Sequence, residues 1–155
     1  MIKPRVLTVS ILLILLGCAI PSARITQTPS GRPEVEIHTS NVFLVTSEII
    51  TTMQTAGFDL QNDTEYSLVF ERELKGQQAV FANKLIGNSS STPPVLEISY
   101  LVSQKGDHIK IVEYSSIATQ MASGQVNRMH LKDNDPWFNQ FNSFLQRVKS
   151  KFDSQ

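Results

Sequence analysis

The 155-residue chain holds one cysteine, Cys18, and three histidines, and these residue types are the best suited to nucleophilic or metal chemistry. A single thiol excludes a disulfide framework and a cysteine-rich zinc site within one chain. His38, His108 and His130 lie far apart in sequence, and none has a second ligand at a spacing such as HxxxH. We therefore expect no metal site, and we expect each histidine to lie in a strand or a turn.

Two groups of carboxylates also have spacings with a chemical interpretation. Glu71 and Glu73 would share one side of a strand, as a general acid and base could, but cationic neighbours favour a solvated edge. Asp133-Asn134-Asp135 resembles the start of a calcium loop without the glycine at position six or the glutamate at position twelve. The chain also lacks a GxSxG elbow, a phosphate loop and a GxGxxG fingerprint. These absences predict a protein that is not an enzyme and needs no cofactor.

Composition narrows the class of protein further. Lys plus Arg and Asp plus Glu number 14 each, and 41% of the residues are apolar. This length suits one domain, and this apolar fraction excludes a chain that is disordered throughout. A formal net charge of zero gives no support for nucleic-acid binding, which favours a basic face.

The first 17 residues have the layout of a secretory signal. Lys3 and Arg5 precede an apolar run from Val6 to Leu16 that only Thr8 and Ser10 interrupt. As a helix this run would span about 16 Å, roughly half the hydrocarbon thickness of a bilayer. It is too short for a transmembrane anchor and suits the apolar region of a signal peptide.

The apolar run ends in Leu15-Leu16-Gly17-Cys18, which resembles the lipobox of bacterial lipoproteins. The resemblance implies cleavage between Gly17 and Cys18, a diacylglycerol on the Cys18 sulfur, and anchoring of the new N-terminus in a membrane. Ala19 follows, rather than the aspartate that retains lipoproteins in the inner membrane of enteric bacteria. The resemblance therefore implies the outer membrane, on its periplasmic side. An ordinary secretory signal and a buried N-terminal helix with an incidental cysteine are the alternatives.

Removal of residues 1–17 changes the charge and exposes a tether. Loss of Lys3 and Arg5 leaves 12 of the 14 basic side chains against 14 acidic ones, a net charge of −2, which disfavours a polybasic surface for nucleic acid. Residues 18–33 are then the lipidated N-terminus and a flexible tether, because residues 19–33 are rich in Pro, Ser and Thr without apolar periodicity. These fifteen residues can reach at most about 50 Å.

Residues 34–155 are predicted to form a single α+β domain, an antiparallel sheet of about four to five strands with two main helices packed on one face. Apolar alternation predicts strands at 34–38, 66–71, 96–102, 109–114 and near 126–131, with 116–121 as an alternative extension of the fourth. Residues 61–64 are interpreted as a polar turn.

Helices are predicted at 42–55, at 77–86 and from Pro136 to about residue 152. Asn41 or Ser40 would cap the first helix and Gly57 would end it, Gly87 would end the second, and Asp135 would cap the third. The third helix has one apolar stripe: Trp137, Phe138, Phe141, Phe144, Leu145, Val148 and Phe152. We expect this stripe to cover the sheet, with a partner-binding ridge as the alternative, and we keep Trp137 as a candidate partner contact.

The order of these elements is similar to that of helix-grip-like modules in some outer-membrane-assembly lipoproteins, a resemblance of topology that transfers no site. We expect a non-enzymatic, membrane-anchored lipoprotein whose domain binds another envelope protein as a scaffold or accessory subunit. The alternative is a periplasmic carrier of lipid or another small ligand, with an apolar cavity under the helices and the Asn88–Pro94 loop at its mouth. A hydrolase is a third and weaker interpretation.

Overall fold

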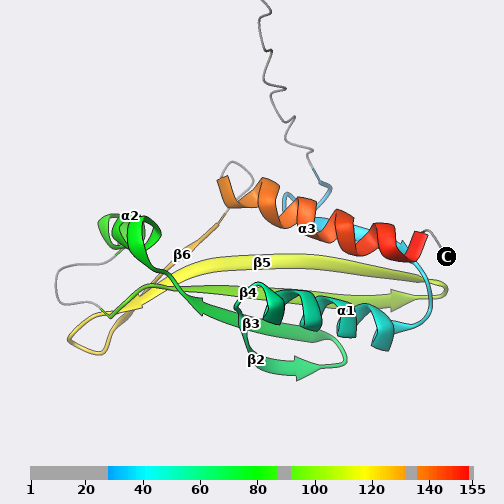
Figure 1. The fold of residues 1–155 in the computed structure, drawn as a ribbon, viewed down its shortest axis with the longest axis horizontal. Coiled ribbons are helices and arrows are strands. Elements are labelled where there is room, and N and C mark those ends of the chain that lie inside the picture. Colours follow the sequence, from blue (N-terminus) through cyan, green and yellow to red (C-terminus); the bar gives the residue numbers. More distant parts are fainter. Residues whose placement is uncertain (1–27, 87–91, 132–135, 154–155) are drawn as a thin grey trace, which may run out of the picture.

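The computed structural model describes residues 28–86, 92–131 and 136–153 (Figure 1). The described chain is an α+β fold with a six-stranded antiparallel sheet and three helices, which confirms the predicted class. In chain order the elements are β1 (Glu34–His38), α1 (Val42–Thr55), β2 (Asp59–Thr64), β3 (Ser67–Glu73), α2 (Gly76–Ile86), β4 (Val95–Lys105), β5 (His108–Gln120), β6 (Val126–His130) and α3 (Pro136–Asp153).

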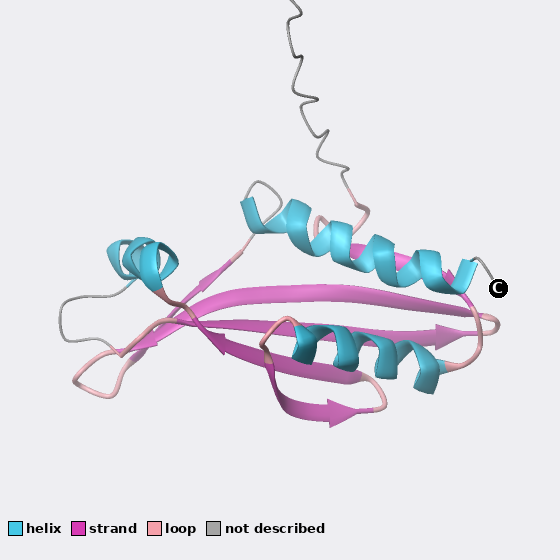
Figure 2. Cartoon of the chain, in the orientation of Figure 1, coloured by secondary structure: helices cyan, strands magenta, loops and turns pink. Residues whose placement is uncertain are grey.

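The helices pack against one face of the sheet and leave the other face open in the described part of the chain (Figure 2). In β5 the side chains of Ile109, Ile111 and Ile117 are buried, whereas Lys110 and Tyr114, which point to the other face, are exposed. Successive side chains of a strand point to opposite faces, so this alternation separates a packed face from an open one. An antiparallel sheet tolerates that asymmetry because one of its faces can remain solvated.

Two strands share one edge of β5. The sheet order is β1-β5-β4-β3-β2, and β6 also pairs with β5. β1 pairs with residues 108–112 and β6 with residues 116–120, so residues 113–115 lie between them. The Glu113 N–H donates to the Pro33 carbonyl at 2.9 Å, and the Leu131 N–H donates to the Ser115 carbonyl at 3.0 Å. We call this junction of Pro33, residues 113–115 and Leu131 the seam.

Tyr100, in the middle of β4, holds the sheet and both long helices together. Its ring is fully buried, with centroids 6.0 Å from Phe70 of β3 and 5.8 Å from Phe144 of α3. Its hydroxyl group lies 3.5 Å from the Met53 sulfur of α1. The space between the sheet and the helices is therefore filled by large side chains at its centre.

The sheet has six strands where four to five were expected, because residues 59–64 form β2. The predicted polar turn at 61–64 is therefore wrong. β2 lies at the edge of the sheet, and all of its side chains except that of Leu60 are exposed. Its sequence therefore lacks the alternation of apolar residues that predicts a strand. The predicted alternative of a longer fourth strand is confirmed, since β5 continues to Gln120.

Local signals placed most helix ends correctly. Asn41 caps α1, and Gly57 follows it with a φ of +80°, a conformation that glycine adopts without strain. The predicted end of α2 at Gly87 and the predicted cap Asp135 lie outside the described residues. Before β1, residues 28–33 form a turn whose last residue, Pro33, is buried, so the folded part begins within the predicted tether. None of the described helices has the length and apolar character of a membrane span.

Candidate functional site

The residues predicted from sequence to act at the N-terminus, Gly17 and Cys18, lie outside the described part of the chain. Trp137 lies in the first turn of α3 and is half-buried. Its ring stacks on that of Phe141 with centroids 6.3 Å apart, and it packs against the core. Part of this indole therefore stabilises the domain, and its role as a partner contact stays a prediction.

Two of the three histidines are neighbours in space. His38 at the end of β1 pairs with His108 at the start of β5, and their ring centroids are 4.3 Å apart. The Asp107 carboxylate lies 2.5 Å from the His108 ring nitrogen Nδ1, and this contact lowers the pKa of Asp107. The described residues contain no group of three or more His, Cys, Asp or Glu side chains arranged to hold a metal ion. The sequence could not show the histidine pair, because it depends on the register of two strands 70 residues apart.

The start of α1 and the β2–β3 turn lie at the same end of the molecule (Figure 1), and large apolar side chains are exposed on both. Phe43 is 75% exposed, Leu44 50% and Tyr66, in the β2–β3 turn, 65%. Tyr66 is also part of the wall of an open hollow of about 450 Å³, lined by Val42, Glu65, Tyr66, Val102, Gln104 and Gly106. We call these three side chains and the hollow the α1-end surface.

Backbone contacts fix the geometry of the α1-end surface. The Asn41 side chain accepts the Leu44 N–H at 3.1 Å, which sets the first turn of α1. The Val102 N–H donates to the Tyr66 carbonyl at 2.9 Å, and the Gln104 amide donates to the Ser40 carbonyl at 3.2 Å. Phe43 and Leu44 are thus positioned by the capped first turn of α1, and Tyr66 by the β2–β3 turn.

Polar groups lie among the apolar ones at this surface. Glu65, through a hydrogen bond and through its charge, raises the pKa of the Tyr66 phenol, which therefore stays protonated. Gln104 adds an amide to the wall of the hollow. Exposed aromatic side chains beside a hollow with hydrogen-bonding groups are typical of protein-binding sites.

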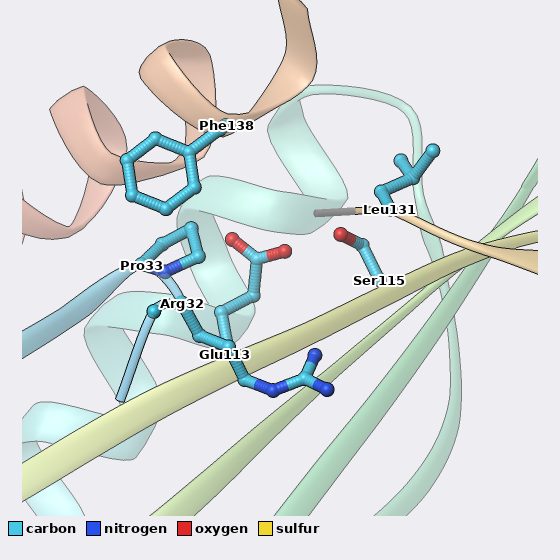
Figure 3. A pocket seen from close by; sticks show the side chains of 7 residues that line it. Arg32, Pro33, Glu113, Ser115, Leu131 and Phe138 are labelled. Carbon is cyan, nitrogen blue, oxygen red and sulfur yellow. The ribbon is translucent and has the colours of Figure 1, made fainter. Parts of the chain in front are cut away.

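The seam holds a second unusual feature, a buried carboxyl group. Glu113 points to the packed face of the sheet, toward Phe138 of α3, and is completely buried (Figure 3). The adjoining space measures about 10 Å³, at the lower limit for one water molecule. Neither carboxyl oxygen has a hydrogen-bond partner among the described residues.

Burial raises the pKa of Glu113 to about 8, because a charge is poorly solvated in the protein interior. The Ser115 hydroxyl and the Arg32 charge both favour the ionised form, but their effect is smaller. The hydroxyl is near without completing a hydrogen bond, and the Arg32 guanidinium stacks 4.2 Å from the Tyr114 ring centroid. Glu113 is therefore mainly protonated at neutral pH.

Glu113 was not predicted as a functional residue, although the sequence contains a pattern that indicates its burial. Ile109, Ile111 and Ile117 alternate inward along β5, and Glu113 occupies an inward position of the same series. An acidic residue at such a position indicates an unusual environment. The sequence does not indicate that Phe43 and Tyr66 are exposed, because large apolar residues at these positions could equally well be buried.

Comparison of the chain with known protein families, characterised proteins and solved structures finds no match. The resemblances to bacterial lipoproteins and to helix-grip-like modules therefore stay predictions.

Proposed function

We propose that the chain is a lipoprotein of the bacterial envelope, anchored through a lipid on Cys18, whose domain binds another envelope protein at the α1-end surface. It acts as a scaffold or accessory subunit without enzymatic activity, on the periplasmic side of the outer membrane. The anchor rests on the signal-like N-terminus and on the Leu15-Leu16-Gly17-Cys18 sequence.

The observation that supports binding is the exposure of Tyr66, which lines the hollow, together with that of Phe43 and Leu44, which follow the lining residue Val42 in the first turn of α1. Soluble domains rarely expose a group of large apolar side chains without a use for it. Aromatic residues often dominate the energy of protein interfaces, since they bury a large area with few rotatable bonds. An apolar side chain of the partner would enter the hollow, and hydrogen-bond donors of the partner would bind the Glu65 carboxylate.

The carrier alternative has weaker support. It needs an enclosed apolar space under the helices, where ligand sites of several hundred Å³ are usual. That region is occupied by Tyr100, whose ring contacts those of Phe70 and Phe144. The α1-end hollow is large enough for a ligand but is open and partly polar.

Metabolic labelling with a fatty acid tests the anchor. The wild-type chain should incorporate label, and Cys18→Ala should abolish it, because Cys18 supplies the only thiol of the chain. A second variant, Gly17→Leu, should slow cleavage of the signal by crowding the scissile bond. Label that persists in Cys18→Ala would overturn the anchor assignment.

Photo-crosslinking in living cells tests the binding surface. A photoreactive amino acid at Phe43 or Tyr66 should give one discrete adduct with an envelope protein. The same amino acid at Gln146, an exposed position on α3, is the matched control and should give none. Equal yields at all three positions, or no adduct at Phe43 and Tyr66, would contradict the proposal.

A further inference from the structure

Helix α2 exposes most of its large apolar side chains, and among them only Ile86 packs against the core. Ala82 is the only fully buried residue of the helix, whereas Val80 and Phe81 are each 57% exposed and Leu85 is 51% exposed. A surface helix ordinarily turns its large apolar side chains toward the core. Both α1 and α3 do so with several residues each, so α2 is the exception among the described helices.

Helix α2 carries one positive charge and no negative one, which is compatible with contact to an anionic surface. Its sequence GQQAVFANKLI contains no acidic residue, and Lys84 lies between Val80 and Leu85 on the outward face. Lys75 precedes the helix and is also exposed. Apolar side chains interspersed with lysine suit the boundary between acyl chains and anionic headgroups.

The position of α2 brings it within reach of the anchor. The chain enters the fold at the seam, where Pro33 contacts Glu113, and α2 is tied to β6 by a hydrogen bond from the Asn127 amide to the Ile86 carbonyl at 2.9 Å. Asn127 pairs with Thr119, six residues along β5 from Glu113, a distance of about 20 Å. Because residues 28–33 belong to the folded part, the stretch from Cys18 to Thr28 can extend at most about 33 Å, which still exceeds that distance and allows α2 to meet the anchoring membrane.

We propose that the outward face of α2, formed by Val80, Phe81, Lys84 and Leu85, rests on the surface of the membrane that holds the lipid anchor. This inference rests on the proposed function, since it takes the anchor at Cys18 as given. Contact with the bilayer orients the domain and directs the α1-end surface, at the opposite end of the molecule, away from the lipid (Figure 1).

A lipid surface suits this face better than a protein does. A stable protein interface buries about 800 Å² per partner and involves 20 or more residues on each side. Three apolar side chains on an 11-residue helix provide much less than that. A tethered domain needs only a weak contact, because the anchor keeps it at high effective concentration beside the bilayer.

A dye whose emission depends on polarity tests the contact in the full chain. It is attached to a new cysteine in Phe81→Cys, with Phe43→Cys and Gln146→Cys as matched controls, while Cys18 carries its lipid. The protein is reconstituted into vesicles of phosphatidylethanolamine and phosphatidylglycerol that contain spin-labelled lipid. Quenching at position 81 should exceed that at the two control positions by at least about threefold, because only the α2 face enters the interface.

A second arm separates failure of this inference from failure of the anchor. A chain with Cys18→Ala and a histidine tag directly before residue 18 is held on vesicles by nickel-chelating lipid, and position 81 is labelled as before. Quenching at 81 in this arm supports the α2 contact even if Cys18 carries no lipid in cells. Equal quenching at positions 81 and 146 in both arms overturns the inference. If quenching is absent and a photoreactive residue at position 81 gives a discrete protein adduct in cells, the inference is also overturned, and the face is assigned to a protein partner.

Lys84→Gln tests the electrostatic part of the contact. A lysine near an anionic surface contributes about 1 kcal/mol, which corresponds to about a fivefold change in the equilibrium between the docked and free domain. This fivefold loss of docking is expected on vesicles with phosphatidylglycerol and not on vesicles of phosphatidylcholine alone. An equal effect on both kinds of vesicle would contradict a role for the charge.

Discussion

Glu113 lies where β1 and β6 both stop along β5, so its carboxyl group is enclosed by three segments that are distant in sequence. Pro33, Leu131 and Phe138 surround it, and each comes from a different element or turn. A buried carboxyl without hydrogen bonds is tolerated more easily as the neutral acid than as the anion. The stability of the domain should therefore depend on pH through this one side chain.

Glu113→Gln should remove that dependence. The pKa of Glu113 is about 8 in the folded chain against 4.5 for an ordinary glutamate, so between these values the folded state holds one more proton than the unfolded state. Unfolding then releases a proton, and the free energy of unfolding falls as the pH rises from about 4.5 to about 8. Relative to wild type, the variant should gain on the order of a few kcal/mol at pH 8 and little at pH 5.

Urea unfolding at several pH values between 5 and 8.5 measures this difference. Glu73→Gln, at an exposed position of β3, is the matched control and should keep the wild-type slope. The pKa of Glu48 is lowered, mainly by a hydrogen bond from Lys151, so its opposite effect on stability falls below about pH 4.5, outside this range. The comparison is between variant and wild type at each pH. Parallel curves for the two would show that Glu113 is ionised or solvated in the folded protein.

At the scale of elements, α1 combines a structural face with an exposed one. Val45, Ile49 and Met53 are buried, while Phe43 and Leu44 in the first turn are exposed. Packing therefore holds the middle and end of the helix, and its first turn depends more on the cap. The Asn41 side chain accepts the Leu44 N–H, one of the N–H groups that have no partner within the helix.

Asn41→Ala should destabilise the domain by about 1 kcal/mol, the usual effect of losing such a cap. Asn41→Ser keeps a side-chain acceptor and should therefore destabilise the domain much less. The free energy of unfolding of both variants in urea provides the measurement. The alanine variant should also give a lower yield of crosslinks from position 43, because the first turn of α1 frays. Equal stability of the two variants would mean that the cap has no role.

At the scale of the whole molecule, the two exposed apolar groups lie at opposite ends. The α1-end surface is beside the β4–β5 turn, and α2 is near the β5–β6 turn (Figure 1). β5 runs between these turns with 13 residues, a length of about 43 Å. Sites so far apart without shared contacts should behave independently.

Paired substitutions should therefore separate the two contacts. Leu44→Ser with Tyr66→Ser should abolish partner crosslinking from position 43 and leave lipid quenching at position 81 unchanged. Val80→Ser with Leu85→Ser should reduce that quenching and leave crosslinking at position 43 in place. All four side chains are at least half exposed, so both variants should melt within a few degrees of wild type. Loss of both readouts in either variant would show that the surfaces are coupled.

Much of the fold could be predicted from the sequence because its signals are local. Alternation of apolar residues identified most of β4 and the first half of β5, and the Asn41 and Gly57 signals bounded α1. β2 was missed because it is an edge strand with polar side chains on both faces. The pairing of both β1 and β6 with one strand was also missed, since the register of β1 on β5 joins residues 70 to 78 positions apart in the chain.

The sequence by itself determined the α+β class, the positions of most elements, and the expectation of a lipid anchor at Cys18. These depend on short-range patterns, which are complete within a few turns of helix or one strand. Only the tertiary structure decided that Glu113 is buried, that His38 meets His108, and that Phe43, Tyr66 and Phe81 are exposed. Burial of a side chain depends on which distant segments cover it, and local spacing carries no information about that cover.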